Sequence, residues 1–484
     1  MDYKIIGHNH EVAMIDMIQA FYPNEKYKAL MPDEASPRFL ESRYQNGLVS
    51  ARFFIDSECR GEIKLPCDDN NIAHTVKLSI HALFKHDQDP PWGILTGIRP
   101  AKIASSLIES GTVDTEILAH MQEKFLISPE RALLCLDVAK AEKSLLENCS
   151  PGGYGLYIGI PFCPSRCLYC SFTSYPIKQY APLTSRYVDT VKKELEHTAQ
   201  LFEGQAPSSI YIGGGTPTSL DDMSFSEILK TVRQTFDLSR LKEYTVEAGR
   251  PDTITDTKLD IMRSHNVSRI SINTQTINDK TLERIGRQHT AAEFMSAYEL
   301  ARKKGFAHIN IDLILGLPGE CEADVERSLE AITALSPEEV TIHTLAIKRA
   351  SKLKEELAET PLAQIAQMEN LLRLSKHYMD NFTYKPYYMY RQKNTLGNFE
   401  NVGYRKPGFG SLYNVQIMEE SHSIAAVGAG AISKFVNRKT NRIERAFNVK
   451  NVDEYMARVD EMNLRKTAAF AKVFGKQVDY YAKQ

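Results

Sequence analysis

Between residues 155 and 347, short β-rich apolar runs alternate with amphipathic helical patterns. The apolar runs are GLYIGIPF, SSIYIGGG, EYTVEAG, VSRISINTQ, HINIDLILGLP and EVTIHTLA, and helical stretches such as SRYVDTVKKELEHTAQLF follow them. Strands that alternate with helices in this way predict consecutive βα units on a parallel sheet. Six strands are fewer than the eight of a closed barrel. The pattern therefore predicts an open partial barrel or a doubly wound sheet.

The residues on either side of this region have different patterns. Strand-like runs at 51–58 and 61–66 precede a helical pattern at 71–86, and further helical spacing continues to about residue 148. A turn-rich SPGGYG segment then marks a boundary. We expect an N-terminal α+β and helical domain over 1–150, the βα region over 151–347, and a mixed C-terminal region over 348–484 that covers the substrate.

Composition narrows the class of protein. A chain of 484 residues with 43% hydrophobic and 25% charged residues predicts a globular protein of more than one domain. A net charge of -2 and a pI near 6.7 give no reason to expect a nucleic-acid partner. The first residues lack a basic segment followed by an apolar run, and no stretch reaches the roughly 18 apolar residues of a membrane helix. We expect a cytoplasmic protein without a membrane span.

Three of the eight cysteines form a C-x-x-x-C-x-x-C motif, Cys163, Cys167 and Cys170, directly after the first predicted strand. The carboxyl ends of parallel strands are where such folds place their chemistry. Three thiolates suit three corners of an iron–sulfur cubane and leave one iron without a protein ligand. The alternatives are a zinc site, which needs a fourth ligand although the next histidine is His197, and unligated core cysteines.

Other candidate residues follow later strands. GGGTPTSL at 213–220 can bring backbone close to a ligand and offer its amides, and Thr216 or Thr218 could begin the next helix. Glu247, Gln275 and Asp312 lie at strand ends, and Arg287 follows the fourth strand. Singly, each is more often a surface or capping residue. Together they are expected to converge on one mouth.

The cysteine spacing and the glycine motif resemble the radical S-adenosylmethionine (SAM) superfamily. The resemblance implies a partial (βα)6 parallel barrel of the radical SAM type. It also implies a 4Fe-4S cluster on Cys163, Cys167 and Cys170, whose open iron chelates SAM. Reductive cleavage of SAM would then release a 5′-deoxyadenosyl radical that abstracts hydrogen.

Longer runs at 266–290, 310–320 and 427–435 resemble the oxygen-independent coproporphyrinogen III oxidase group. Segments 92–100 and 388–404 are similar to its longer bacterial branch, coproporphyrinogen dehydrogenase. The resemblance implies that Arg287 binds the methionyl carboxylate of SAM. It also implies that Asp312 and Gln275 hold the ribose of SAM. Tyr157 is also the catalytic candidate. The positions that match cofactor contacts are Tyr157, Tyr169, Gly214, Gly215, Thr216, Glu247, Gln275, Arg287, Asp312, Ala346 and Ile432.

The resemblance implies oxidative decarboxylation of coproporphyrinogen III to protoporphyrinogen IX in haem biosynthesis, with an external electron donor such as flavodoxin or ferredoxin. Hydrogen abstraction from a propionate β-carbon, then loss of CO₂ and one electron, would leave each vinyl group. Phe172 stands where the best-known oxidases have a further cysteine. The alternatives are a haem-trafficking chaperone, although the chain has no Trp beyond Trp92, and a radical enzyme acting on another tetrapyrrole.

The tetrapyrrole substrate carries four propionates, so a chain of negative net charge must bind it through local cations. The segment 383–394 combines Tyr387, Tyr388 and Tyr390 with Arg391 and Lys393, and Arg405 follows. Arginine suits bidentate carboxylate binding, and tyrosines can flank a flat macrocycle. We predict that Arg391 and Lys393 anchor propionates at the barrel mouth. The alternative is a solvated basic loop beside core tyrosines.

Overall fold

The structure is a computed structural model of the chain. It describes residues 1–22, 25–85, 90–147, 149, 152–170, 172, 174–346, 365–392, 395, 398–437, 439–440 and 442–475. The chain forms two compact units, one of Met1–Ala139 with Tyr390–Glu400 and one of Lys140–Met389 with Asn401–Gln484. The three-part division expected from the sequence stays a prediction. None of the described helices is long and apolar enough to cross a membrane.

The first unit contains a four-stranded sheet in the order β1-β2-β3-β4, in which only the β1–β2 pair is parallel. Its strands are β1 (Asp2–Ile6), β2 (Arg38–Gln45), β3 (Leu48–Ile55) and β4 (Glu58–Pro66). The helices up to residue 146 are α1 (Glu11–Phe21), α2 (Ile72–Phe84), α3 (Ala101–Glu109), α4 (Asp114–Phe125) and α5 (Pro129–Leu146). Met14, Met17 and Ile80 are fully buried between α1, α2 and the sheet. The strand and helix patterns expected at 51–85 are confirmed by β3, β4 and α2.

The sheet of the second unit follows the order β13-β14-β12-β11-β10-β9-β8-β5-β15-β16-β17 in the part of the chain that is described. The six predicted βα strands are confirmed as β5 (Tyr154–Ile160), β8 (Pro207–Gly214), β9 (Glu243–Glu247), β10 (Arg269–Ser271), β11 (Ile309–Leu315) and β12 (Glu339–Thr344). Each pair of neighbours among them is parallel. Nearly every residue of β5 is buried, as expected for a parallel strand covered on both faces.

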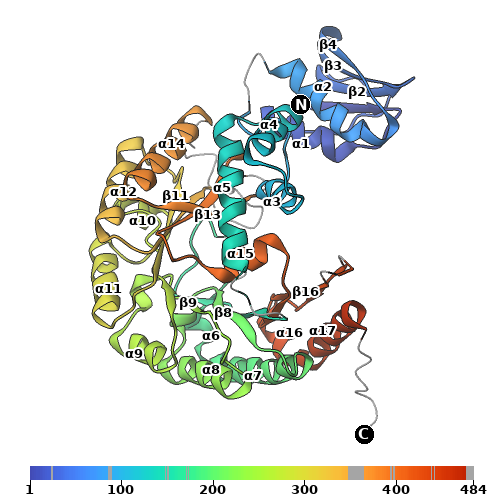
Figure 1. Ribbon diagram of the computed structural model, residues 1–484. Helices are drawn as coiled ribbons and strands as arrows, with labels where there is room; N and C mark the ends of the chain where they lie inside the picture. The colour runs from blue at the N-terminus through green and yellow to red at the C-terminus, as the bar shows by residue number, and fades with distance from the viewer. Residues whose placement is uncertain are drawn as a thin grey trace. The chain divides into compact units, whose positions relative to one another are not determined.

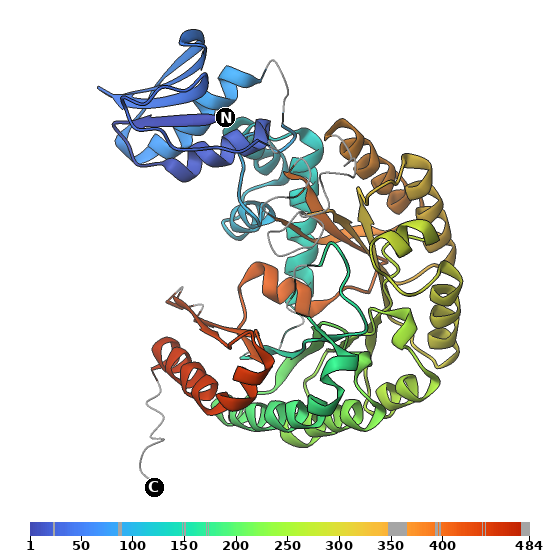
Figure 2. The same ribbon diagram turned by 180° about the vertical axis from the view of Figure 1, so that it is seen from behind.

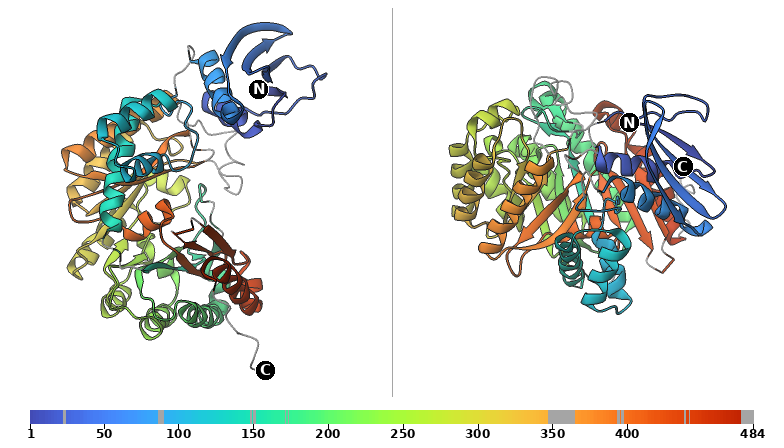
Figure 3. Two further views of the ribbon diagram at one scale, coloured as in Figure 1. Left: turned by 45° about the vertical axis from the view of Figure 1, so that its right-hand side comes forward. Right: turned by 90° about the horizontal axis from the view of Figure 1, so that it is seen from above.

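Helices line the outer side of these strands (Figures 1 and 2). Figure 3 shows the same layering in two further views. Val188, Val191 and Leu195 recur at helical spacing on the buried face of α7, which explains how a mostly polar helix packs on the sheet. The α-helices in the described part of this unit are α6 (Ile177–Tyr180), α7 (Thr184–Leu201), α8 (Asp222–Thr235), α9 (Asp256–Ser264), α10 (Asp279–Arg284), α11 (Ala291–Lys303), α12 (Glu322–Leu335), α14 (Ile365–Asn381), α15 (Leu412–Glu419), α16 (Val452–Ala457) and α17 (Val459–Phe474).

The C-terminal region extends this sheet at both ends. On one side β15 (Ile424–Val427) pairs parallel with β5, and β16 (Ile432–Asn437) and β17 (Arg442–Phe447) continue the sheet antiparallel. On the other side β14 (Glu400–Arg405) pairs antiparallel with β12, followed by β13 (Lys385–Arg391). The parallel part of the sheet therefore has a seventh strand, which the sequence pattern did not reveal.

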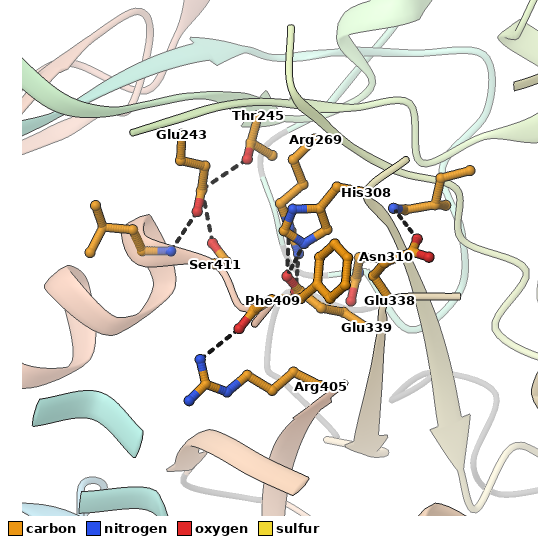
Figure 4. A network of polar contacts seen from close by, with 12 residues as sticks. Glu243, Thr245, Arg269, His308, Asn310, Glu338, Glu339, Arg405, Phe409 and Ser411 are labelled. Atoms are coloured by element: carbon orange, nitrogen blue, oxygen red, sulfur yellow. Dashed lines mark hydrogen bonds and ion pairs between the residues drawn. The ribbon is translucent and has the colours of Figure 1, made fainter. Parts of the chain in front are cut away.

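A buried ion pair lies at the amino edge of this sheet (Figure 4). Arg269 on β10 donates Nη2 to Glu339 Oε2 on β12 at 2.6 Å, and both side chains are almost fully buried. Tyr387 on β13 donates its hydroxyl to the same carboxylate at 2.7 Å. Burial alone would raise the pKa of Glu339, but Arg269 and His308 hold it well below its usual range. The carboxylate is therefore charged, and it joins three strands at one edge.

The same network corrects the expected position of the tyrosine-rich segment. Because β14 runs antiparallel to β12, Arg405 lies opposite Glu339 at the amino edge. There Arg405 donates Nη1 to the Phe409 carbonyl at 2.6 Å. Tyr387 and Arg405 are thus far along their strands from the carboxyl edge, where the sequence analysis expected the barrel mouth. Their contacts stabilise the fold.

Breaking this buried pair should destabilise the chain strongly. Glu339→Gln leaves the buried charge of Arg269 without its counter-ion, so the free energy of unfolding in urea should fall by about 3–5 kcal/mol. Asp380→Asn is the control, because it breaks an exposed pair with Lys376 and should cost at most about 1 kcal/mol. Equal losses for the two variants would contradict the assignment.

Candidate functional site

The cysteine loop, residues 161–170, follows the carboxyl end of β5. It is attached to the segment after α10, since the Leu168 amide donates to the Ile285 carbonyl at 3.0 Å and the Ser165 hydroxyl donates to the Gly286 carbonyl at 3.0 Å. Within the loop, the short strand β6 (Phe162–Cys163) pairs in parallel with β7 (Tyr175–Pro176), which follows the loop. The three cysteines are therefore held at the carboxyl edge, as predicted.

The three thiols are close enough to affect one another. Burial raises the pKa of Cys163 to about 11, a hydrogen bond from Thr216 opposes this, and the neighbouring Cys170 and Cys167 add to it. Burial is also the main cause that raises the pKa of Cys170. Among the described residues, no three Cys, His, Asp or Glu side chains are gathered tightly enough to hold a single metal ion. Thiolates at such positions need a nearby positive charge, and metal binding supplies it with release of protons.

Arg287 connects the cysteine loop to two strand ends. Its buried guanidinium donates Nη2 to the Tyr169 hydroxyl at 3.0 Å, and Nη1 to the Gly249 and Asn273 carbonyls at 2.8 and 3.1 Å. Tyr169 lies within the loop, while Gly249 and Asn273 follow β9 and β10. The sequence analysis expected Arg287 to bind a carboxylate. The observed contacts fix the position of the loop, and the carboxylate contact stays a prediction.

Arg250 is a second buried cation beside the loop, and the sequence analysis missed it. Its guanidinium forms two hydrogen bonds to Asp252, at 3.0 and 3.1 Å. Nη1 donates to the Ser165 hydroxyl at 3.1 Å and lies 3.9 Å from Cys167 Sγ. A basic residue three positions after Glu247, at the same strand end, was the available signal.

The glycine motif approaches the cysteine loop as predicted. A Cβ atom on Gly215 would lie 2.6 Å from the Phe162 carbonyl oxygen and 3.0 Å from Cys163 Sγ, so no larger residue fits there. Thr216 Oγ1 donates to Cys163 Sγ at 3.5 Å. Two of the predicted cofactor positions therefore border the first cysteine.

The amides of this motif are used within the protein, which differs from the expectation. They donate to protein oxygens in three contacts: Gly214 to Glu247 Oε2 at 3.1 Å, Gly215 to Ile160 O at 2.7 Å, and Thr216 to Phe162 O at 2.7 Å. Thr216 precedes a short 3-10 helix at Pro217–Ser219, whereas the next α-helix, α8, begins further along the chain. Asp221 caps α8, because its side chain accepts from the Ser224 amide.

Glu247 ends β9 on the inner face of the sheet. Burial raises its pKa to about 7, although Tyr211 donates to it at 2.5 Å and the Gly214 amide also donates, and the negative charge of Asp312 adds to the rise. A carboxyl group with a pKa near neutrality can change its charge when a cation binds. Glu247 and Asp312 are brought together as predicted.

Asp312, on β11, is held by neighbouring side chains. Burial would raise its pKa, but His343 and Asn310 outweigh that effect and hold the pKa below its usual range. His343 Nε2 lies 3.6 Å from Asp312 Oδ2, and Asn310 Nδ2 donates to Oδ1 at 2.7 Å. The backbone amide of Gln275 donates to the backbone carbonyl of Asp312 at 3.0 Å. Gln275 has a φ of 73°, which is a strained backbone conformation for a residue other than glycine. The sequence analysis did not single out His343.

Three tyrosines stack beside this carboxylate pair. The rings of Tyr157 on β5 and Tyr211 on β8 have centroids 6.3 Å apart, and Tyr413 of α15 lies 4.5 Å from Tyr211 and 6.0 Å from Tyr157. The Tyr157 hydroxyl lies beside Gly214, because a Cβ atom added at Gly214 would lie 3.0 Å from that hydroxyl. Tyr157, the catalytic candidate, therefore faces the glycine motif. Tyr211 and Tyr413 were missed because their proximity depends on tertiary structure.

The remaining predicted residues are more dispersed. Ala346 follows β12 at the carboxyl edge, and Ile432 begins β16 with 47% of its surface exposed. Arg391 belongs to the first unit, where its buried guanidinium lies 4.9 Å from the Trp92 ring centre and donates Nε to the Asn398 carbonyl at 3.0 Å. These contacts do not favour the predicted propionate contact. Lys393 lies outside the described residues.

Comparisons with known proteins agree with this geometry. A family model described as the Radical SAM superfamily matches residues 157–332. The oxygen-independent coproporphyrinogen-III oxidase-like protein HemZ of Bacillus subtilis is 37% identical over 393 residues, which cover 80% of this chain and 78% of the relative. The chain belongs to the radical SAM superfamily. Membership implies a 4Fe-4S cluster and SAM.

Other relatives carry a different name. Heme chaperone HemW of Lactococcus lactis is 30% identical over 275 residues, covering 57% of this chain and 68% of the relative. Among solved structures, the radical SAM coproporphyrinogen III oxidase HemN of Escherichia coli has a TM-score of 0.54 at 22% identity, covering 68% of this chain and 78% of that chain. The structural likeness confirms the predicted α/β fold of this superfamily.

The pKa of Glu247 predicts a pH dependence of SAM binding. When the pH is above the Glu247 pKa of about 7, the carboxylate form predominates and attracts the ammonium group of SAM. The neutral acid that forms at lower pH does not. We expect the dissociation constant of SAM for the anaerobically reconstituted protein to fall by about threefold to tenfold between pH 6 and pH 8. Calorimetry at both pH values measures it.

Glu247→Gln should remove most of this pH dependence, while Glu444→Gln on β17 should keep it. A pH dependence that survives unchanged in Glu247→Gln would contradict the assignment.

Proposed function

We propose that this chain catalyses the oxidative decarboxylation of coproporphyrinogen III to protoporphyrinogen IX, using a 4Fe-4S cluster and SAM. The observation that carries the proposal is the combination of the cysteine loop with a relative, 37% identical over 80% of the chain, that is called an oxygen-independent coproporphyrinogen-III oxidase-like protein. The substrate is a tetrapyrrole, and an external donor such as flavodoxin or ferredoxin supplies electrons.

The donor set of the loop fits the cluster. Cys163, Cys167 and Cys170 supply three soft ligands, which matches a cubane with one iron left open for SAM. Two buried cations, Arg250 and Arg287, lie beside the loop, and positive charge there favours an anionic cluster. When bound, the cluster and SAM supply a 5′-deoxyadenosyl radical, which removes hydrogen from a propionate side chain.

The residues of this chain hold SAM and exclude water. Carbonyl oxygens of the glycine motif and the Glu247 carboxylate suit the ammonium group, because only acceptors can bind it. Asp312, oriented by His343 and Asn310, suits the ribose hydroxyls together with Gln275. Arg287 is the cation assigned to the methionyl carboxylate, and Tyr157 covers the cofactor from the sheet. Two rounds of reaction release two CO₂, and a one-electron acceptor takes the remaining electron each time.

A haem-trafficking chaperone is the second candidate. Relatives named heme chaperone HemW share up to 31% identity with parts of this chain. Phe172 also stands where the best-known oxidases have a further cysteine, and it is exposed. Both functions would retain the cluster, so the fate of the tetrapyrrole distinguishes them.

The decisive experiment is anaerobic incubation of the reconstituted protein with SAM, a reductant and coproporphyrinogen III, followed by mass spectrometry of the tetrapyrrole. We expect successive loss of two carboxyl groups. Cys170→Ala should form no product because it lacks a cluster ligand, whereas Cys321→Ala, which changes an exposed cysteine, should retain activity. Stable haem binding with no loss of CO₂ would overturn the oxidase and support the chaperone.

A further inference from the structure

Four side chains form a row across one face of the second unit's sheet. Tyr157 on β5 is the register partner of Ala426 on β15, and Ile432 on β16 is the register partner of Phe447 on β17. β15 pairs antiparallel with β16 through Ile424 and Lys434, and extending that register by two residues sets Ala426 opposite Ile432. Register partners project from the same face of a sheet, so the row leads outward from Tyr157 to Phe447.

This face is the inner one, on which α15 lies. Tyr413 of α15 stacks on Tyr157. Lys434 lies two residues after Ile432 on β16, on the same face, and donates Nζ to the Ile417 carbonyl of α15 at 3.0 Å. The opposite face of β16 is covered, because the ring of Phe435 lies 5.4 Å from that of Phe470 on α17. The row therefore borders the same space as the candidate cofactor residues.

The outer half of the row is apolar and uncovered. Ile432 is 47% exposed and Phe447 is 53% exposed, although both lie on the inner face of a sheet. The chain beyond Phe447 turns against the cysteine loop, since the Tyr175 hydroxyl donates to the Lys450 carbonyl at 3.3 Å and Tyr175 pairs with Phe162 beside Cys163. An exposed apolar pair at this place is a surface for a ligand of the site.

Two cations lie next to the apolar pair on the same face of the sheet. Arg445 and Lys434 are register partners on the same face, two residues from Phe447 and Ile432. Both contact one carboxylate, Glu420, at 2.8 Å from Arg445 Nη2 and 3.2 Å from Lys434 Nζ. The Arg445 side chain is 46% exposed, so part of it is open to solvent. Its guanidinium can therefore bind a further carboxylate.

We propose that Phe447 and Ile432 support the macrocycle of the tetrapyrrole substrate, and that Arg445 binds one of its propionates. This inference rests on the proposed function and names its substrate contacts. Ile432 and Phe447 are direct partners on neighbouring strands, and an apolar surface edged by a guanidinium suits a macrocycle that carries carboxylates. The Arg445 guanidinium matches the carboxylates of the substrate, whereas the one carboxylate of SAM is assigned to Arg287. Arg445 takes the role that the sequence analysis gave to Arg391.

Binding of coproporphyrin III tests the proposal, because this stable tetracarboxylate needs neither reductant nor turnover. Fluorescence anisotropy with the reconstituted protein should show a dissociation constant about fivefold to tenfold higher for Arg445→Ala and for Phe447→Ala than for the unmodified chain. Arg445→Lys keeps the charge and should recover part of the loss. The control is Arg442→Ala, which removes an exposed arginine from the opposite face of β17 and should bind normally.

Three further readings complete the test. Cluster content and SAM affinity should stay unchanged in all variants, and a loss of SAM affinity instead of porphyrin affinity would assign this surface to the cofactor and overturn the proposal. Failure of the unmodified chain to bind coproporphyrin III, or equal binding by all variants, would also overturn it. Weaker binding by Arg445→Ala in a protein that never releases CO₂ would support this surface and reject only the proposed reaction.

Discussion

The buried guanidinium of Arg287 is the contact on which the candidate site depends. It binds the Tyr169 hydroxyl of the cysteine loop and the carbonyls that follow β9 and β10, so one cation joins the loop to two strand ends. Burying a charge is costly unless hydrogen bonds compensate it, and these three oxygens provide that compensation. Because the cation lies near the thiols, the same group that positions the loop also favours negative charge on the sulfurs.

The two edges of the parallel sheet have opposite roles. At the amino edge, Arg269 and Glu339 form a buried pair that draws together the strands and the C-terminal region. At the carboxyl edge, Glu247 and Asp312 bring two carboxyl groups close together, and the pKa of Glu247 is raised to about 7. The amino edge is thus closed by a buried ion pair, whereas the carboxyl edge gathers two carboxyl groups that can face a ligand. This arrangement fits a cofactor that carries both an ammonium group and hydroxyls.

Local patterns in the sequence were sufficient for part of this account. The alternation of strands and helices predicted β5 and β8–β12, and the spacing of Cys163, Cys167 and Cys170 predicted their common loop. Contacts between distant segments were not predictable in the same way. Tyr413 reaches Tyr157 only because α15 packs on the inner face of the sheet. The strands β15–β17 follow one another without an intervening helix, so the alternation of strands and helices does not extend to them.

The error over the tyrosine-rich segment has a related cause. Arg391 and Tyr387 are neighbours in sequence, and charge with aromatic content suggested one substrate-binding surface. Strand direction, which the sequence does not state, sends Tyr387 to the amino edge, and Arg391 belongs to the other unit. Arg445, a cation on the inner face, is separated from the cysteine motif by more than half of the chain and joins the same sheet only through strand pairing.

The central claim is that three thiols on one loop hold a cluster whose fourth iron is open to SAM. Mössbauer spectroscopy of protein reconstituted anaerobically with ⁵⁷Fe tests it most directly. We expect a 4Fe-4S spectrum in which addition of SAM changes the signal of one iron in four and leaves the other three unaltered. A spectrum in which all four irons are indifferent to SAM, or a cluster retained in full after Cys163, Cys167 and Cys170 are all replaced by Ala, would contradict the account.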